Sequence, residues 1–71
     1  MNLDQIIKDA QFSLKVNLEI LLERKINAEF NPTDYNLRML QSQETRVLEK
    51  QNFLNRLQGL KDVSSIQLVL N

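Results

Sequence analysis

The sequence predicts an all-α protein: an antiparallel, coiled-coil-like hairpin of two helices, followed by a short apolar tail. Apolar residues recur at helical spacing on both sides of the only proline, Pro32, which lies near the middle of the 71 residues. The only glycine, Gly59, follows the second periodic segment, where a helix C-cap is expected. We therefore predict a single domain over residues 1–71, with helices at 2–28 and 32–58, a turn at 29–32 and a tail at 59–71.

The first helix has a clear start and one broad apolar stripe. Asn2 is a suitable N-cap, and Gln5 follows it three residues later, as in a capping box. At about 100° per residue, the apolar residues of one side form a stripe that we expect to be the seam with the second helix. These residues are Leu3, Ile6, Ile7, Ala10, Leu14, Leu18, Leu21 and Ala28.

A second apolar set on the first helix lies roughly opposite this stripe. Phe12, Val16 and Ile20 are spaced by four residues, so they stack along one line of the helix. Single apolar residues on a surface are normal, which is the plainer interpretation. We favour a second packing face for another chain, because Phe12 is large and a lone hairpin cannot cover both sides.

The second helix begins with the motif Asn31-Pro32-Thr33-Asp34. Asn31 suits the N-cap, Pro32 the first helical position and Asp34 the acidic position of a capping box. Phe30 and Tyr35 stand where the two residues of a hydrophobic staple would pack.

Apolar residues of the second helix also share one side: Tyr35, Met39, Leu40, Val47, Phe53, Leu54 and Leu57. Leu40, Val47 and Leu54 repeat every seven residues, but the companion positions that we assign, Glu44 and Gln51, are polar. A long autonomous coiled coil is therefore not expected. Leu37 and Leu48 lie on a separate flank that one partner helix would leave uncovered.

The tail after Gly59 is too apolar for a solvated end. Ile66, Leu68 and Leu70 alternate as in a strand, whereas Val63, Ile66 and Leu70 fit a helix, so the periodicity leaves both forms open. In either form, Ile66, Leu68, Val69 and Leu70 require a surface to cover them.

Composition narrows the possible functions. The chain has no cysteine, and therefore no thiolate ligand, and no histidine, which is the commonest general base and metal ligand. Its serines thus lack a histidine or cysteine partner that could activate them, and we expect neither an enzyme nor a cofactor. Nine basic and nine acidic residues balance, which argues against nucleic-acid binding. We also expect no small-molecule substrate, no transmembrane segment and no signal peptide, and therefore a cytoplasmic protein, unless a dedicated apparatus exports it without a cleaved signal.

Chains this short rarely bury enough apolar area to be stable alone, so a protein partner or a homo-oligomer is the expected supplement. The predicted partner-binding residues are those left outside the seam: Phe12, Val16, Ile20, Leu37, Leu48, Ile66, Leu68, Val69 and Leu70.

Short motifs give the chain a resemblance to the small helical-hairpin proteins of the bacterial type III secretion needle. The motifs that resemble those of the needle subunits are Met1-Asn2-Leu3, Asn31-Pro32, Leu60-Lys61-Asp62-Val63 and Ile66. This resemblance implies a hairpin whose tail packs between subunits of a helical tube. The second helix, however, carries Glu44, Arg46, Glu49 and Lys50, whereas needle helices are sparing in charge.

The charged second helix is more similar to that of the co-chaperones that hold needle subunits before export. Those proteins are short hairpins with a proline at the turn and an aromatic residue three positions later, as in Pro32 and Tyr35, although they usually lack an apolar tail. The resemblance thus implies a chaperone or assembly factor that binds a helical partner. The alternatives are a self-polymerising subunit and an unrelated small helical regulator or adaptor.

Overall fold

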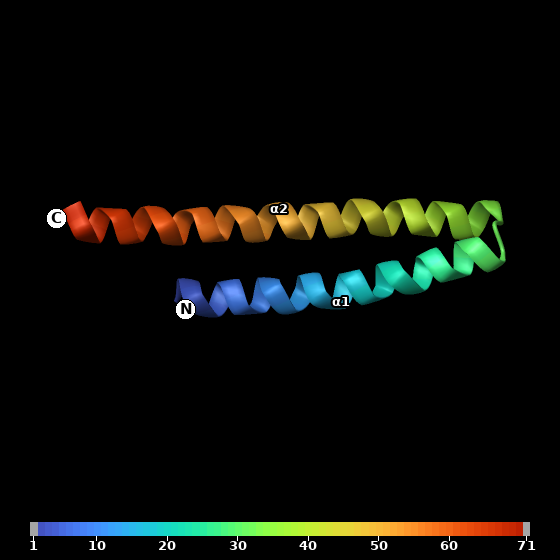
Figure 1. Ribbon diagram of the computed structural model, residues 1–71, viewed down its shortest axis with the longest axis horizontal. Helices are drawn as coiled ribbons and strands as arrows, with labels where there is room; N and C mark the ends of the chain where they lie inside the picture. Colours follow the sequence, from blue (N-terminus) through green and yellow to red (C-terminus); the bar gives the residue numbers. More distant parts are fainter. Residues whose placement is uncertain (1, 71) are drawn as a thin grey trace.

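The computed structural model is an all-α hairpin of two long helices (Figure 1). Helix α1 spans Leu3–Phe30 and helix α2 spans Asp34–Leu70. The structure describes the backbone of residues 2–70 and the side chains of residues 2–63. The molecule is a rod of 58 × 15 × 15 Å, in which α2 continues well beyond the first turn of α1. The hairpin predicted from the sequence is confirmed.

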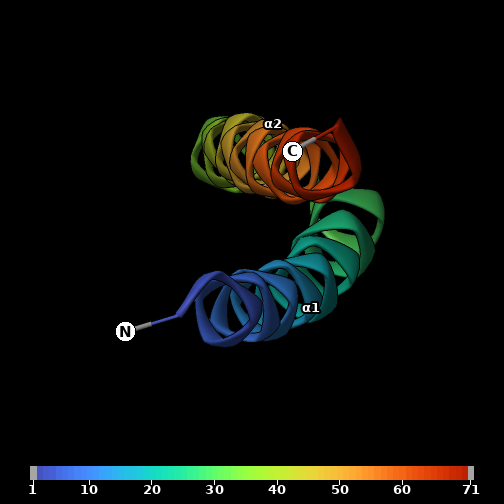
Figure 2. The same ribbon diagram turned by 90° about the vertical axis from the view of Figure 1, so that its left-hand side faces the viewer.

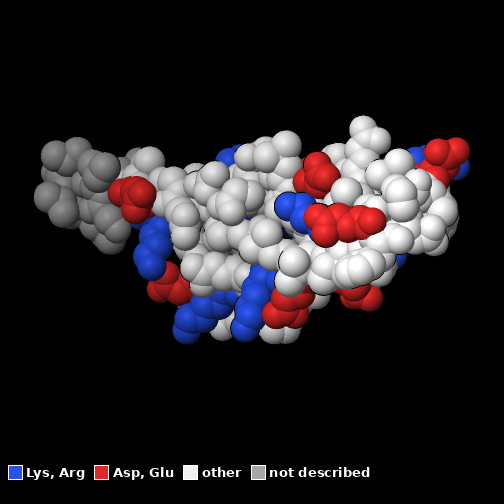
Figure 3. Space-filling model, turned by 45° about the vertical axis from the view of Figure 1, so that its right-hand side comes forward, with Lys and Arg blue, Asp and Glu red and all other residues white. Residues whose placement is uncertain are grey.

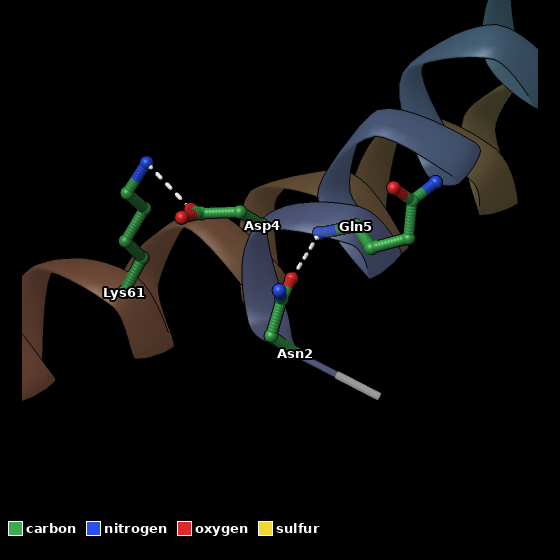
Figure 4. A network of polar contacts seen from close by, with 4 residues as sticks. All are labelled: Asn2, Asp4, Gln5 and Lys61. Carbon is green, nitrogen blue, oxygen red and sulfur yellow. Dashed lines mark hydrogen bonds and ion pairs between the residues drawn. The ribbon is translucent and has the colours of Figure 1, made fainter.

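Helix α1 starts as the sequence predicts. Asn2 is extended, and its side-chain oxygen accepts a hydrogen bond of 2.8 Å from the backbone N–H of Gln5 (Figure 4). This bond satisfies one of the N–H groups that the first turn of a helix leaves without a partner. Asp4 adds an acidic side chain to the same turn, where the helix dipole favours it.

The start of α2 differs from the prediction by two residues. Thr33 is the cap: its hydroxyl accepts the backbone N–H of Asn36 at 3.1 Å, and its carbonyl accepts that of Leu37. Asn31 instead ends α1, because its N–H bonds to the carbonyl of Asn27 at 2.9 Å. Pro32 therefore lies in a three-residue loop rather than in the first turn.

The predicted hydrophobic staple does not form, because Phe30 and Tyr35 are both exposed.

The predicted end of α2 at Gln58 is also wrong, because the helix runs through Gly59 to Leu70. Gly59 does not adopt a positive φ, so it is an ordinary helical residue and not a left-handed cap. Glycine costs a helix interior only about 1 kcal/mol relative to alanine, and no proline follows it to stop the helix. Residues 59–70, predicted as a separate tail, are a continuation of α2.

The two helices meet along a seam whose residues alternate between spacings of three and four, as in a coiled coil. Viewed from the open end in Figure 2, α1 shifts sideways along α2 as the helices run toward the loop. The seam comprises Leu3, Ile7, Ala10, Leu14, Asn17, Leu21, Arg24 and Ala28 of α1, and Asn36, Leu40, Gln43, Val47, Lys50, Leu54, Leu57 and Lys61 of α2. The true companions of Leu40, Val47 and Leu54 are thus Gln43, Lys50 and Leu57, rather than Glu44 and Gln51.

The apolar core lies at the open end of this seam. Its buried residues are Ile7, Ala10, Leu14, Leu54 and Leu57, and Leu3, Ile6 and Val47 pack against them. Leu18, which we placed in the seam, is exposed, because the left-handed supercoil passes the seam from Leu14 to Asn17 and Leu21. The remaining predicted seam residues of α1 are buried or half-buried.

Candidate functional site

A polar layer interrupts the seam in the middle of the paired region. The side chain of Gln43 is only 5% exposed, and its amide nitrogen donates to the backbone oxygen of Asn17 at 2.8 Å and to the side-chain oxygen of Asn17 at 3.1 Å. The Asn17 amide nitrogen donates in turn to the carbonyl of Ser13 at 2.7 Å. This chain of bonds fits only one alignment of the helices, since a slip would leave the Gln43 amide buried without its acceptors.

The seam has two flanks, and one of them contains an open cavity. On α1 this flank consists of the residues that directly precede Ile7, Leu14 and Leu21, namely Ile6, Ser13 and Ile20. On α2 it consists of Met39, Arg46, Phe53 and Leu60, and Val16, Tyr35 and Val63 border it. We call these ten residues the groove side.

The cavity of the groove side has a volume of about 260 Å³ and is lined by Ile6, Asp9, Ala10, Ser13, Lys50 and Phe53. Phe53 remains 48% exposed at its edge, so the hairpin alone does not fill this space. A hollow with apolar residues at its floor and edge and charged residues at its rim suits an apolar side chain of a packed helix.

The second candidate surface is the end of α2, which projects past the start of α1 and which we call the overhang (residues 58–70). Only the first turn of α1 reaches it, through Asp4 and Lys61, and the described part of α1 does not run alongside the rest of the overhang (Figure 1). Leu60 and Val63, at its beginning, are both more than half exposed. Both belong to the groove side, so that surface continues onto the overhang.

An ion pair marks the point where pairing of the helices stops. The Lys61 ammonium lies 2.9 Å from a carboxylate oxygen of Asp4 (Figure 4). The hydrogen bond from Lys61 and its charge, helped by the charge of Lys8, hold the pKa of Asp4 below its usual range. Both side chains are more than half exposed, so the pair fastens the first turn of α1 to α2 only weakly.

The opposite flank of the seam, which we call the leucine side, carries four exposed leucines. Leu18 and Leu37 directly flank the seam, and Leu22 and Leu48 lie farther round the two helices. Charged residues separate them along each helix, among them Lys15, Lys25 and Glu44. This flank is therefore a set of scattered leucines rather than a groove.

The structure divides the predicted partner-binding residues among several surfaces. Phe12 is 69% exposed on the back of α1, and Val16 is exposed at the border of the groove side. Ile20 is half-buried beside the seam. The prediction that Phe12, Val16 and Ile20 form one outer face is therefore wrong. Leu37 and Leu48 are exposed on the leucine side.

The predicted tail residues Ile66, Leu68, Val69 and Leu70 lie on the α2 backbone, but their side chains are outside the described residues. Phe53, Leu60 and Val63 were not among the predicted partner-binding residues. The alternating spacing through Gln43, Lys50 and Leu57 would have placed Phe53 and Leu60 on a seam flank and revealed them.

The described side chains contain no group of three or more acidic residues placed to hold a metal ion. Within the same part of the chain, neither helix has a stretch long and apolar enough to cross a membrane. Figure 3 shows uncharged side chains over much of the face that it presents, with basic and acidic side chains mixed along the lower edge. Comparison with protein-family models, curated proteins and solved structures found no match to this chain.

Proposed function

We propose that this chain is a non-enzymatic interaction module, a small assembly factor whose α2 overhang binds a helical segment of another protein. The observation that carries the proposal is that α2 extends beyond α1 as a helix through Leu70, without a second helix beside it. The hairpin supplies the base from which this single helix projects.

The length and chemistry of the overhang support this proposal. The nine residues beyond the Lys61–Asp4 pair, 62–70, span about 14 Å, and an isolated helix of this length is marginal in water without tertiary packing. Leu60 and Val63 expose apolar surface at its base, and the sequence continues with Ile66, Leu68, Val69 and Leu70. An amphipathic partner helix would cover this surface as α1 covers the preceding part of α2.

The partner that we propose is a small helical subunit of a secretion apparatus. This step rests on the resemblance of the charged second helix, with Pro32 and Tyr35, to the co-chaperones of the type III secretion needle. The second candidate function is a self-polymerising subunit. The segment Leu60-Lys61-Asp62-Val63, at the base of the overhang, favours that candidate, because it resembles the segment that leads into the tail of needle subunits.

Site-specific photo-crosslinking in the native cell tests the proposal. A photoreactive residue at Val63 should give an adduct with a different small protein, whereas the same residue at Thr45, exposed in the middle of α2, should not. A ladder of adducts between copies of the chain would favour the polymerising subunit. If Val63 gives only the adducts that Thr45 also gives, both functions are contradicted.

Truncation of the chain after Asp62 provides a second test of the proposed function. It leaves the seam complete, so the truncated chain should keep its hairpin by circular dichroism and lose the partner.

A further inference from the structure

We propose that the groove side is covered by a second copy of this chain, so that two hairpins form a four-helix bundle about a twofold axis parallel to the helices. The inference rests on the proposed function in treating the chain as an interaction module. The second copy covers the groove side along the paired helices, and Leu60 and Val63 on the overhang stay available to the proposed partner.

The exposed area of the hairpin is large enough to supply the interface of such a dimer. The chain exposes 5762 Å², whereas a compact protein of 8.3 kDa exposes about 4,600 Å². The excess of about 1,200 Å² exceeds the roughly 800 Å² that each partner contributes to a standard interface. A second hairpin of the same length can therefore cover most of this excess along one side of the rod.

The groove side is the flank best suited to this contact. It holds the cavity beside Phe53 and adds the apolar surface of Val16 and Ile20. The leucine side exposes single leucines that are separated by Lys15, Lys25 and Glu44. The chain is also neutral overall, so long-range repulsion does not oppose the approach of a second copy.

Charge selects how the second copy is oriented. Toward the groove side, the open-end half of α1 presents the single acidic residue Asp9, whereas α2 presents Arg46, Lys50 and Arg56 against one acid, Glu49. A twofold axis parallel to the helices places α1 of each copy over α2 of the other, which brings acid to base. An axis perpendicular to the helices would place α2 over α2 and bring the basic segments together.

The parallel axis also places both overhangs at the same end of the bundle. Leu60 and Val63 of the two copies then face the same region just past the ends of the two α1 helices. The dimer would thereby present two overhangs to one helical partner, which links this interface to the proposed function.

Sedimentation equilibrium of the purified full chain, from about 1 to 200 µM, tests the interface. The wild type should be a dimer at the upper concentrations. Phe53→Glu should raise the dimer dissociation constant at least 100-fold, because it places a carboxylate in the contact. Leu48→Glu is the matched control, since Leu48 is 61% exposed in the same helix but lies on the leucine side, and it should leave the constant within about threefold. Val16→Lys, on the other helix, should repeat the loss while the circular dichroism of the hairpin is retained.

Spin labelling tests the axis, and the absence of cysteine makes one introduced cysteine a unique label. Labels at Gln58 should lie within about 25 Å of each other for a shared end and about 40 Å apart for opposite ends, at 1.5 Å per residue. A monomer at every concentration, or a dimer that Leu48→Glu disrupts and Phe53→Glu does not, would overturn the interface.

The two proposals fail separately. A monomer that still loses its cross-linked partner on truncation after Asp62 leaves the proposed function standing. A dimer that gives no cross-linked partner at Val63 leaves only the proposed dimer interface standing.

Discussion

In the half of the seam at the open end, Ile7, Ala10 and Leu14 pack with Leu54 and Leu57, whereas the half beside the loop buries mainly Ala28 and the amide of Gln43. The residues that lie farthest apart in the chain therefore make the most apolar contact. The residues next to the loop are held by backbone caps and hydrogen bonds. We infer that burial at the open end supplies most of the stability, while the polar layer fixes the alignment of the helices.

Truncating a leucine should destabilise the hairpin more in the open-end half of the seam than in the half beside the loop. Leu54→Ala should lower the free energy of unfolding by about 3 kcal/mol, because Leu54 is a buried core residue and its truncation leaves a cavity. Leu40→Ala, the same change in the half-buried loop half, should cost about half as much. Urea unfolding followed by circular dichroism at one fixed protein concentration measures both values. Equal losses would show that stability is spread evenly along the seam.

The second prediction concerns the polar layer, where stability and alignment should separate. Gln43→Ala should cost about 2 kcal/mol, because the bonds to Asn17 are lost and a gap is left in the seam. Replacing Asn17 and Gln43 together by leucine should restore or raise the stability, since an apolar pair incurs no desolvation cost. The leucine pair should also permit other alignments, as happens when a buried polar residue is removed from a coiled coil.

Spin labels at Gln11 and Gln51, diluted with unlabelled protein, measure that alignment. The wild type should give one narrow distance, and the double leucine variant a broader or shifted distribution. A narrow, unchanged distance in the variant would assign the alignment to the loop instead of the polar layer.

The third prediction extends the comparison beyond the open end, to Gly59. A Cβ added at this residue would meet nothing within 4 Å, and the backbone is helical there. Gly59→Ala should therefore stabilise the local helix by about 1 kcal/mol and slow amide exchange of residues 58–63 roughly fivefold. Asn52→Gly, an exposed position of the same helix, should have the opposite effect on its own neighbours. Lower helicity in Gly59→Ala would mean that the glycine ends α2, as its position in the sequence suggests.

The sequence was sufficient for the fold class because both helices carry strong periodic signals, and Asn2 and Gln5 fix the first start. It misplaced the second start because Asn31 and Thr33 are both good caps, and only the geometry of the loop decides between them. It misplaced the second end because a glycine after a periodic segment is compatible both with a cap and with a continuing helix.

The candidate surfaces were harder to predict, because they depend on the alignment of the two helices. Two seam positions of α2 are occupied by the polar residues Gln43 and Lys50, so the apolar pattern does not follow the seam. The position of Phe53 on a flank of the seam could therefore not be predicted. Val16 was identified because a four-residue spacing is visible within a single helix. Which flank of α1 lies beside which flank of α2 is a property of the pair and not of either segment alone.

The ion pair at the open end should make a small contribution to stability that depends on pH. Because Lys61 and Lys8 hold the pKa of Asp4 below its usual range, the folded chain binds this proton more weakly than the unfolded chain. The contribution of the pair should therefore be fully present above the ordinary carboxyl pKa of about 3.9 and be lost as the pH falls below it, through the lowered pKa. Asp4→Asn should lower the urea midpoint slightly at pH 7, and the gap from the wild type should close at acidic pH and in high salt. Asp62→Asn, which removes a carboxylate from the same end, corrects for the change in net charge. A gap that stays constant with pH and salt would mean that Asp4 acts through the helix start and not through Lys61.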